Sequence, residues 1–238
     1  MVVGARDGDG VRRVEWLLGA MCAVLAVSIG AMAVLVPLSV RAERQRRRTL
    51  ARWAAAHRWS FARAGRAGWT NRLPGRNRQG LGVTLSGRMD GRTVTIADYQ
   101  YQTTSTRTGS DGNTHRRKHN HRYIVVMIQL DRAHPPVAIT TRGLLSQLGR
   151  SLFGDRPTAT GNPYFDRDFR VLSPNPTHAK ELVGPPLMAA HLGDAVPTWS
   201  IVGTELVTYS PGYLRDPSRI PAYACGPLRI AALLGCPA

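Results

Sequence analysis

Hydrophobic and polar positions divide the chain into one long apolar segment and a following region of mixed pattern. No charged residue occurs from Trp16 to Val40. A helix of ~25 residues rises roughly 37 Å, which is enough to cross the ~30 Å hydrocarbon core of a bilayer. The pattern therefore predicts a transmembrane helix over residues 16–40, after an N-terminal tail of residues 1–15.

A cleaved signal peptide is the alternative interpretation of this segment. Ala31, Met32 and Ala33 match the small-x-small pattern of a cleavage site. The apolar run continues through Leu38, however, whereas the apolar part of a signal peptide has ~7–15 residues. The uncleaved anchor is therefore the favoured interpretation.

Alternating apolar and polar positions after residue 49 predict β-strands. His121 to Leu130 is a nearly continuous run of β-favouring residues, which is typical of a central strand. Gly203 is expected to be the turn of a late hairpin. The predicted strands are 81–87, 92–103, 121–130, 136–140, 165–172, 199–202 and 205–209.

Helical periodicity occurs between and after these strands. Leucines recur at helical spacing over residues 143–153. Asn175 followed by Pro176 is typical of a helix N-terminus, and this helix is expected to break at the next Gly-Pro-Pro sequence and then resume. A last helix is expected over residues 227–234. Early strands and late helices indicate an α+β fold over residues 49–238, with a mostly antiparallel sheet and packed helices.

A long polar segment separates two of the predicted strands. No aliphatic or aromatic side chain occurs from Thr103 to Arg122. Such a segment cannot contribute to a hydrophobic core, so we expect an exposed loop over residues 103–120. Loops of this length inside a compact domain are uncommon and are often functional or disordered.

The net charge of the chain is +17, and its location matters more than its size. Residues 41–122 hold 19 basic and four acidic side chains, which accounts for +15 of the total. Residues 41–48 are expected to form a basic helix next to the membrane. Basic side chains there gain about 1 kcal/mol each from anionic headgroups, or serve only to set topology. The basic side chains expected to face lipid are Arg41, Arg44, Arg46, Arg47 and Arg48.

The two flanks of the apolar segment predict its orientation. The flank richer in Lys and Arg stays in the cytoplasm. Three arginines precede the segment, and six follow it within residues 41–52. The protein is therefore expected in the cell membrane as a single-pass protein with a cytoplasmic C-terminal domain.

Small residues within the apolar segment suggest a weak dimerisation pattern. Gly19 with Ala23, and Ala26 with Gly30, have the small-xxx-small spacing that lets two helices approach closely. A homodimer through the transmembrane helix is therefore one hypothesis, although such pairs are common in Ala-rich segments.

Motifs that carry known chemistry are missing from the sequence. There is no Gly-Lys dipeptide for a P-loop, no G-x-G-x-x-G, no G-x-S-x-G, no H-E-x-x-H and no C-x-x-C. No cofactor is therefore expected. The absence of these motifs leaves open an enzyme whose residues meet only in space.

Two sets of side chains remain as chemical candidates. Asp166 and Asp168 would share one face of the predicted strand, as a carboxylate pair for acid–base catalysis or as an ordinary salt-bridged edge. His115, His119 and His121 could hold zinc or nickel. Their Arg and Lys neighbours disfavour a divalent cation, so a solvated polar segment is the simpler interpretation.

Nucleic-acid binding is disfavoured despite the positive charge. Such binding would need basic residues interleaved with exposed aromatic residues. The aromatic residues nearby are Trp53, Trp59, Phe61 and Trp69, and their spacing fits core packing instead.

One part of the chain resembles a known group of proteins. The runs IADYQY, FDRDFRVLSPNPTHAKELVGPPLMAAHL and WSIVGTELVTY are similar to actinobacterial single-pass membrane proteins of unknown function. In that group an N-terminal transmembrane helix precedes an α+β domain with F-D-x-x-F-x-V and A-x-x-L-x-x-P-L patterns. The resemblance covers roughly residues 49–238, and here one extra residue precedes the second pattern's proline. The matching residues are Phe165, Asp166, Phe169, Val171, Ala179, Leu182, Pro186 and Leu187.

These observations favour a non-enzymatic binding or scaffold domain held at the inner membrane face. Its expected partners are other proteins or anionic lipid headgroups. The alternatives are an enzyme with a site around Asp166 and Asp168, and a metal-binding histidine segment.

Overall fold

The computed structural model describes residues 21, 38–75, 80–108, 114–141, 153 and 157–235. The chain divides into two units, Met1–Arg48 and Thr49–Ala238. Most of the predicted transmembrane segment, residues 16–40, lies outside the described residues. Within the described ranges no helix combines the length and apolar character needed to cross a membrane. Residues 38–56 are helical, as the sequence predicts for 41–48.

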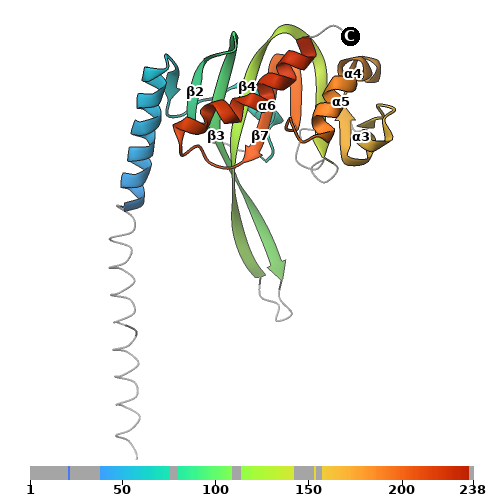
Figure 1. Cartoon of the computed structure of the whole chain (residues 1–238). Coiled ribbons are helices and arrows are strands. Elements are labelled where there is room, and N and C mark those ends of the chain that lie inside the picture. Colours follow the sequence, from blue (N-terminus) through green and yellow to red (C-terminus); the bar gives the residue numbers. More distant parts are fainter. Residues whose placement is uncertain are drawn as a thin grey trace, which may run out of the picture. The chain divides into compact units, whose positions relative to one another are not determined.

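The described residues of the second unit form a seven-stranded antiparallel sheet, which confirms the predicted α+β class (Figure 1). The strand order is β1-β2-β3-β4-β6-β5, and β7 also pairs with β4. The strands are β1 (Ser60–Ala62), β2 (Leu81–Met89), β3 (Arg92–Thr108), β4 (Thr114–Thr141), β5 (Pro157–Thr158), β6 (Phe169–Leu172) and β7 (Trp199–Pro211).

Strand β4 organises the sheet because it pairs with three other strands. Its middle part, which contains the predicted central strand 121–130, pairs with β3 on one edge and with β7 on the other. Farther along, Ile139 pairs with Val171 of β6 and with Trp199 of β7. The β-favouring run in the sequence is therefore paired with another strand along each of its edges, as expected for a central strand.

The predicted hairpin around Gly203 is wrong. Residues 199–211 form one strand, and both halves of β7 pair with β4. The register shifts on either side of the pair between His134 and Gly203, and Gly203 has a φ of 62°. The glycine therefore accommodates an irregularity inside the sheet, where a positive φ is needed, and does not reverse the chain.

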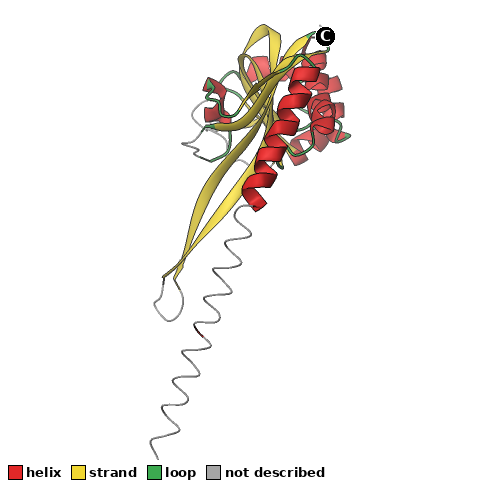
Figure 2. Ribbon diagram, turned by 90° about the vertical axis from the view of Figure 1, so that its left-hand side faces the viewer, coloured by secondary structure: helices red, strands yellow, loops and turns green. Residues whose placement is uncertain are grey.

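The two faces of the sheet have different covers (Figure 2). Val94, Ile96 and Ile128 belong to the larger core, which includes residues of α6. Ala97 and Tyr99 point to the opposite face and pack with Trp69 of a short 3-10 helix. The helices are η1 (Gly68–Arg72), α3 (Pro163–Asp168), α4 (Pro176–Leu182), α5 (Pro185–Leu192), η2 (Pro217–Arg219) and α6 (Ile220–Gly235).

The broken helix predicted after Asn175 is confirmed as α4 and α5. The Asn175 side chain accepts a hydrogen bond from the His178 amide at 3.1 Å, and proline occupies the start of both helices. The predicted C-terminal helix is α6, which begins earlier than expected. The helix predicted over residues 143–153 lies outside the described residues except for Phe153.

The strand predicted over residues 165–172 is only half correct. Residues 163–168 form α3, and β6 begins at Phe169. The Asn162 side chain accepts hydrogen bonds from the amides of Tyr164 and Phe165, and Pro163 takes the first helical position. This local capping begins a helix over residues that had been predicted as the first half of the strand.

The loop predicted over residues 103–120 is also corrected by the structure. Its described residues are strands, since β3 runs to Thr108 and β4 begins at Thr114. The pairing continues without a shift from Tyr99 with Tyr123 to Thr108 with Thr114. This ribbon, here called the arm (residues 100–108 and 114–122), projects beyond the rest of the sheet (Figure 1). Apart from the buried Tyr101 and the half-buried His121, its described side chains are exposed, and each strand of the arm pairs along one edge with the other strand.

Candidate functional site

The basic helix contains two kinds of arginine. Arg46 donates to the Glu43 carboxylate through two nitrogens at 2.9 Å, and Arg47 also binds Glu43. Arg41, Arg44 and Arg48 are exposed, and no ion pair joins them to another described residue. The spacing of these three residues places them on one helix face. Three of the five arginines predicted to face lipid therefore carry charge that no carboxylate in the described chain offsets.

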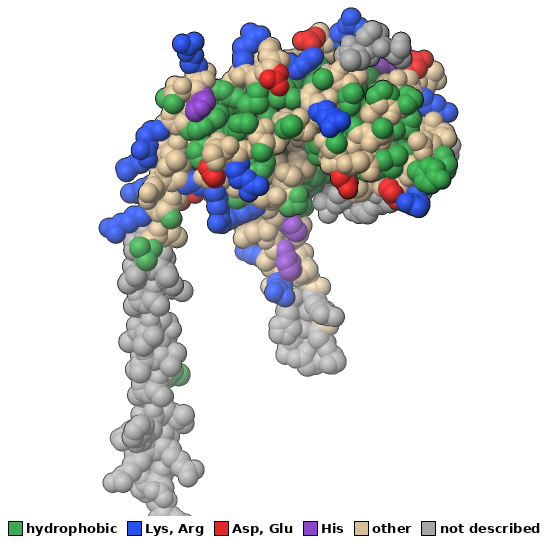
Figure 3. Space-filling model, viewed as in Figure 1, with side chains coloured by type: hydrophobic (Ala, Val, Ile, Leu, Met, Phe, Trp, Pro, Cys, Tyr) green, Lys and Arg blue, Asp and Glu red, His purple; other side chains and the backbone are tan. Residues whose placement is uncertain are grey.

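The arm has two faces because side chains alternate along its strands. Arg116, Lys118 and Arg122 share one face and are exposed. These three residues are here called the cationic face. Across from them on β3 stand Thr106, Thr104 and Gln100, which are uncharged. Figure 3 shows basic and histidine side chains along the arm.

The opposite face of the arm carries His119 and His121, two of the three predicted histidines. Thr103 Oγ1 lies 2.9 Å from His121 Nε2, and Ser105 Oγ lies 3.3 Å from His119 Nε2. His119 and His121 therefore share a face as predicted, but each imidazole is engaged by a hydroxyl. Among the described residues no group of three His, Cys, Asp or Glu side chains could hold a metal ion. The side chain of His115 is not among those that the structure describes, so metal binding by the three histidines stays a prediction.

Aromatic rings connect the arm to the sheet. The ring of Tyr101 stacks on His121 at 4.7 Å and on Tyr123 at 6.0 Å between centroids. Tyr123 in turn meets Tyr209 of β7 edge to face. Burial raises the pKa of Tyr209 to about 12, so this phenol stays neutral at physiological pH. The cluster fixes the base of the arm to the domain.

The two candidate carboxylates do not form an acid–base pair. Asp166 and Asp168 lie two positions apart on α3, and at 3.6 residues per turn their side chains diverge by roughly 200°. Asp166 accepts hydrogen bonds from the Thr160 amide and hydroxyl at 3.1 and 2.9 Å. Asp168 pairs with the neighbouring Arg167 at 3.1 Å. The predicted shared face depended on a strand that is not there.

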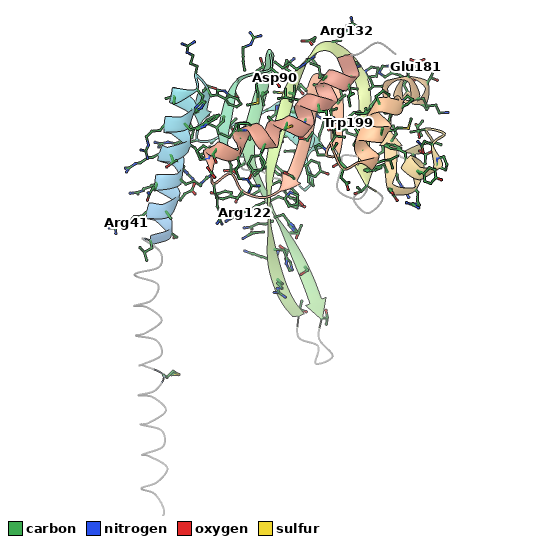
Figure 4. All side chains as sticks on the ribbon, in the orientation of Figure 1. Arg41, Asp90, Arg122, Arg132, Glu181 and Trp199 are labelled. Carbon is green, nitrogen blue, oxygen red and sulfur yellow. The ribbon has the colours of Figure 1, made fainter. Side chains whose placement is uncertain are left out.

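A cavity of about 210 Å³ lies at the far end of β4 from the arm. Figure 4 shows Arg132 at this end and Arg122 at the base of the arm. Arg92 pairs with Asp131 at 2.7 Å in the cavity wall. Burial, His178 and Arg132 together lower the pKa of His134, so its imidazole is neutral at pH 7. The lining residues are Arg92, Leu130, Asp131, Arg132, His134, Ala231 and Leu234.

The described lining residues of this cavity do not form the arrangement expected of a catalytic centre. Among its described lining residues, the one carboxylate, on Asp131, pairs with Arg92, and none is a Ser, Cys, Thr or Lys nucleophile. The cavity could hold a small anion against Arg132. The sequence pattern contained no signal for it, because β4 and α6 supply residues that are about 100 positions apart.

No protein-family model matches the chain, and no curated protein matches it. The fold is similar to that of a solved structure, the mycobacterial trehalose monomycolate transport factor A, TtfA, with a TM-score of 0.50. The match covers 80% of this chain and 92% of that chain at 13% sequence identity. At this identity the likeness shows the fold alone. It agrees with the α+β domain that the resemblance noted in the sequence implies.

Proposed function

We propose that this chain is a non-enzymatic protein of the inner membrane face, where its basic helix binds anionic lipid headgroups and its α+β domain serves as a scaffold. The observation that carries the proposal is the exposed set of Arg41, Arg44 and Arg48 on one helix face. The uncharged segment from Trp16 to Val40 precedes that set in the sequence and supports membrane anchoring.

The expected strength of the lipid contact follows from the charge. At about 1 kcal/mol for each basic residue near an anionic surface, three arginines contribute about 3 kcal/mol, or roughly a hundredfold in affinity. Glu43 offsets part of the charge of Arg46 and Arg47, so we expect these two to contribute less.

The likeness to TtfA suggests the process that the scaffold serves. That protein is named as a transport factor for trehalose monomycolate, a glycolipid. A domain with the same fold and no evident catalytic site in its described part fits an accessory role in the transport of envelope lipids. Deleting the gene and measuring the distribution of extractable glycolipids between the membrane and the cell surface tests this role. An unchanged distribution would contradict it.

The lipid contact is tested with the full-length chain in nanodiscs of neutral phosphatidylcholine, with and without phosphatidylglycerol. Hydrogen exchange of residues 41–52 should slow when the anionic lipid is present. The triple variant Arg41→Gln, Arg44→Gln, Arg48→Gln should lose this effect. The double variant Arg46→Gln, Arg47→Gln is the matched control and should retain most of it. Equal exchange in both lipids would refute the lipid contact.

The cytoplasmic orientation is part of the proposal and needs its own test. Thr104 is exposed, so Thr104→Cys in a cysteine-free background provides a labelling site. An impermeant maleimide should label it only after the membrane is permeabilised. Labelling in intact cells would place the domain on the outer side.

A further inference from the structure

The arm has open backbone edges on both sides. β7 accompanies β4 only as far as the pair between Pro211 and Tyr123, and the Gly212 amide then donates to the Arg122 carbonyl at 3.0 Å. Beyond this point no described strand pairs with the outer edge of β4. β2 likewise leaves β3 at the pair between Leu81 and Tyr99. The arm is therefore a two-stranded ribbon with unpaired N–H and C=O groups along both strands.

A ribbon of this kind gains more from a third strand than an ordinary edge does. Two-stranded hairpins are only marginally stable in water, and the described side chains of this one bury no apolar surface beyond Tyr101. Its threonines favour extended backbone, and no proline interrupts its described strands. An added strand would satisfy one row of backbone groups, as in strand-addition complexes.

The charges along β4 restrict which sequences the added third strand can have. Arg116 and Lys118 alternate along the cationic face, and Arg117 and His119 occupy the other face. No acidic side chain lies in the described part of the arm. Residues directly opposite in an antiparallel pair stand about 5 Å apart, and like charges at that distance are destabilising. A second copy of the β4 edge would therefore be repelled.

We propose that the outer edge of β4 from Thr114 to His121 binds an extended acidic segment of a partner protein by strand addition. The segment would pair with β4 beyond Tyr123, where the pairing with β7 ends. Its carboxylates, at alternate positions, would lie beside Arg116 and Lys118 of the cationic face. This site uses none of the residues of the basic helix and does not depend on the proposed lipid contact.

The test uses the full-length chain in nanodiscs of neutral lipid and a short synthetic peptide of alternating Glu and Thr. Fluorescence anisotropy measures binding, and hydrogen exchange measures protection of the arm. The alternating peptide should bind and should slow exchange over residues 114–121. A peptide of the same composition with its glutamates grouped at one end should bind about tenfold more weakly or worse. Equal binding of the two peptides would overturn the proposal.

Two further comparisons separate strand addition from simple charge attraction. A peptide with every backbone nitrogen methylated keeps its carboxylates but loses the N–H donors on both edges, so it should not bind. Binding as tight as that of the unmodified peptide would refute strand addition. If the alternating peptide fails to protect the arm and phosphatidylglycerol nanodiscs do protect it, the arm is a lipid contact and the proposal is wrong.

Charge reversal provides a gain-of-binding control against misfolding. The variant Arg116→Glu, Lys118→Glu should lose the acidic peptide and bind the corresponding alternating Lys peptide. Arg63→Glu, an exposed site outside the arm, should bind the acidic peptide as the unaltered chain does. Loss of acidic-peptide binding in both variants would show that the contact is not located on the arm and would overturn the assignment.

Discussion

The indole Nε1 of Trp199 donates a hydrogen bond to Nε2 of His191 at 3.0 Å inside the core. Both side chains are buried, and Nδ1 of His191 has no hydrogen-bond partner among the described residues. An imidazole that accepts at Nε2 and is neutral carries its proton on Nδ1. Burial lowers the pKa of His191 to about 4, so the fold holds this histidine uncharged.

This histidine predicts a loss of stability in mild acid. The unfolded chain protonates His191 near its ordinary pKa of about 6.5, whereas the folded chain resists protonation until about pH 4. The stability is therefore complete above about pH 6.5 and falls as the pH drops toward 4, by at most about 3 kcal/mol from this group. Urea unfolding at several pH values, followed by tryptophan fluorescence, measures the slope.

The His191→Leu variant isolates the contribution of this group to that slope. Its free energy of unfolding should depend less on pH between 4 and 6.5 than that of the unaltered chain. His119→Gln, which changes an exposed histidine of the arm, should leave the slope intact. Identical slopes for the unaltered chain and His191→Leu would show that His191 titrates normally.

The ion pair between Arg72 and Glu205 predicts unequal costs for removing its two members. The Arg72 side chain is 2% exposed and the Glu205 side chain 38% exposed, and they meet at 2.9 Å. Glu205→Gln leaves a buried guanidinium without a counterion, at a cost of about 3 kcal/mol. Arg72→Met leaves a carboxylate that water can reach, so about 1 kcal/mol is expected. Chemical denaturation of both variants measures the order, and a larger cost for Arg72→Met would contradict it.

Gly87 of β2 predicts a steric effect on the core. A Cβ at this position would overlap the ring of Trp59, which is buried. Gly87→Ala should therefore displace Trp59 and destabilise the domain by about 2 kcal/mol, with a change in tryptophan fluorescence. Gly68→Ala is the control, since a Cβ there meets no atom within 4 Å. A neutral Gly87→Ala variant would mean that Trp59 packs elsewhere.

The two aspartates of α3 predict different outcomes on substitution. Asp166→Ala removes the acceptor of the Thr160 amide and hydroxyl, so we expect a loss of about 2 kcal/mol. Asp168→Ala removes only an exposed contact with Arg167 and should change stability by less than about 0.5 kcal/mol. Thermal unfolding of the two variants distinguishes them. Equal losses of stability in the two variants would contradict this difference.

Local signals explain which elements the sequence predicts correctly. A continuous β-favouring run is typical of a central strand, because such a strand can bury both of its faces. Residues 121–130 are such a run, and they lie in the central strand β4. The Asn-Pro pair at 175–176 starts a helix because it combines a capping side chain with a fixed φ. The same pair occurs at 162–163 and starts α3, although residues 165–172 had been predicted as a strand.

Features that depend on distant residues could not be predicted in this way. The polar sequence of the arm excluded it from the core and so suggested a loop. A strand, however, needs a partner strand for its backbone hydrogen bonds and does not need contact with a core. Whether Gly203 turns the chain or bends a strand depends on β4, which lies far away in the sequence. Arg72 and Glu205 are 133 positions apart, and no periodic pattern connects them.

The dependence of β4 on β7 also affects synthesis of the protein. Val125 and Val126 of β4 pair with Tyr209 and Thr208, which leave the ribosome much later. At about 5–20 residues per second, the roughly 60 residues between the end of β4 and the start of β7 take several seconds to emerge. During that interval the nascent chain presents a long apolar strand with one bare edge. Truncation before Trp199 would make this transient state permanent, so shortened forms should aggregate instead of yielding a smaller stable domain.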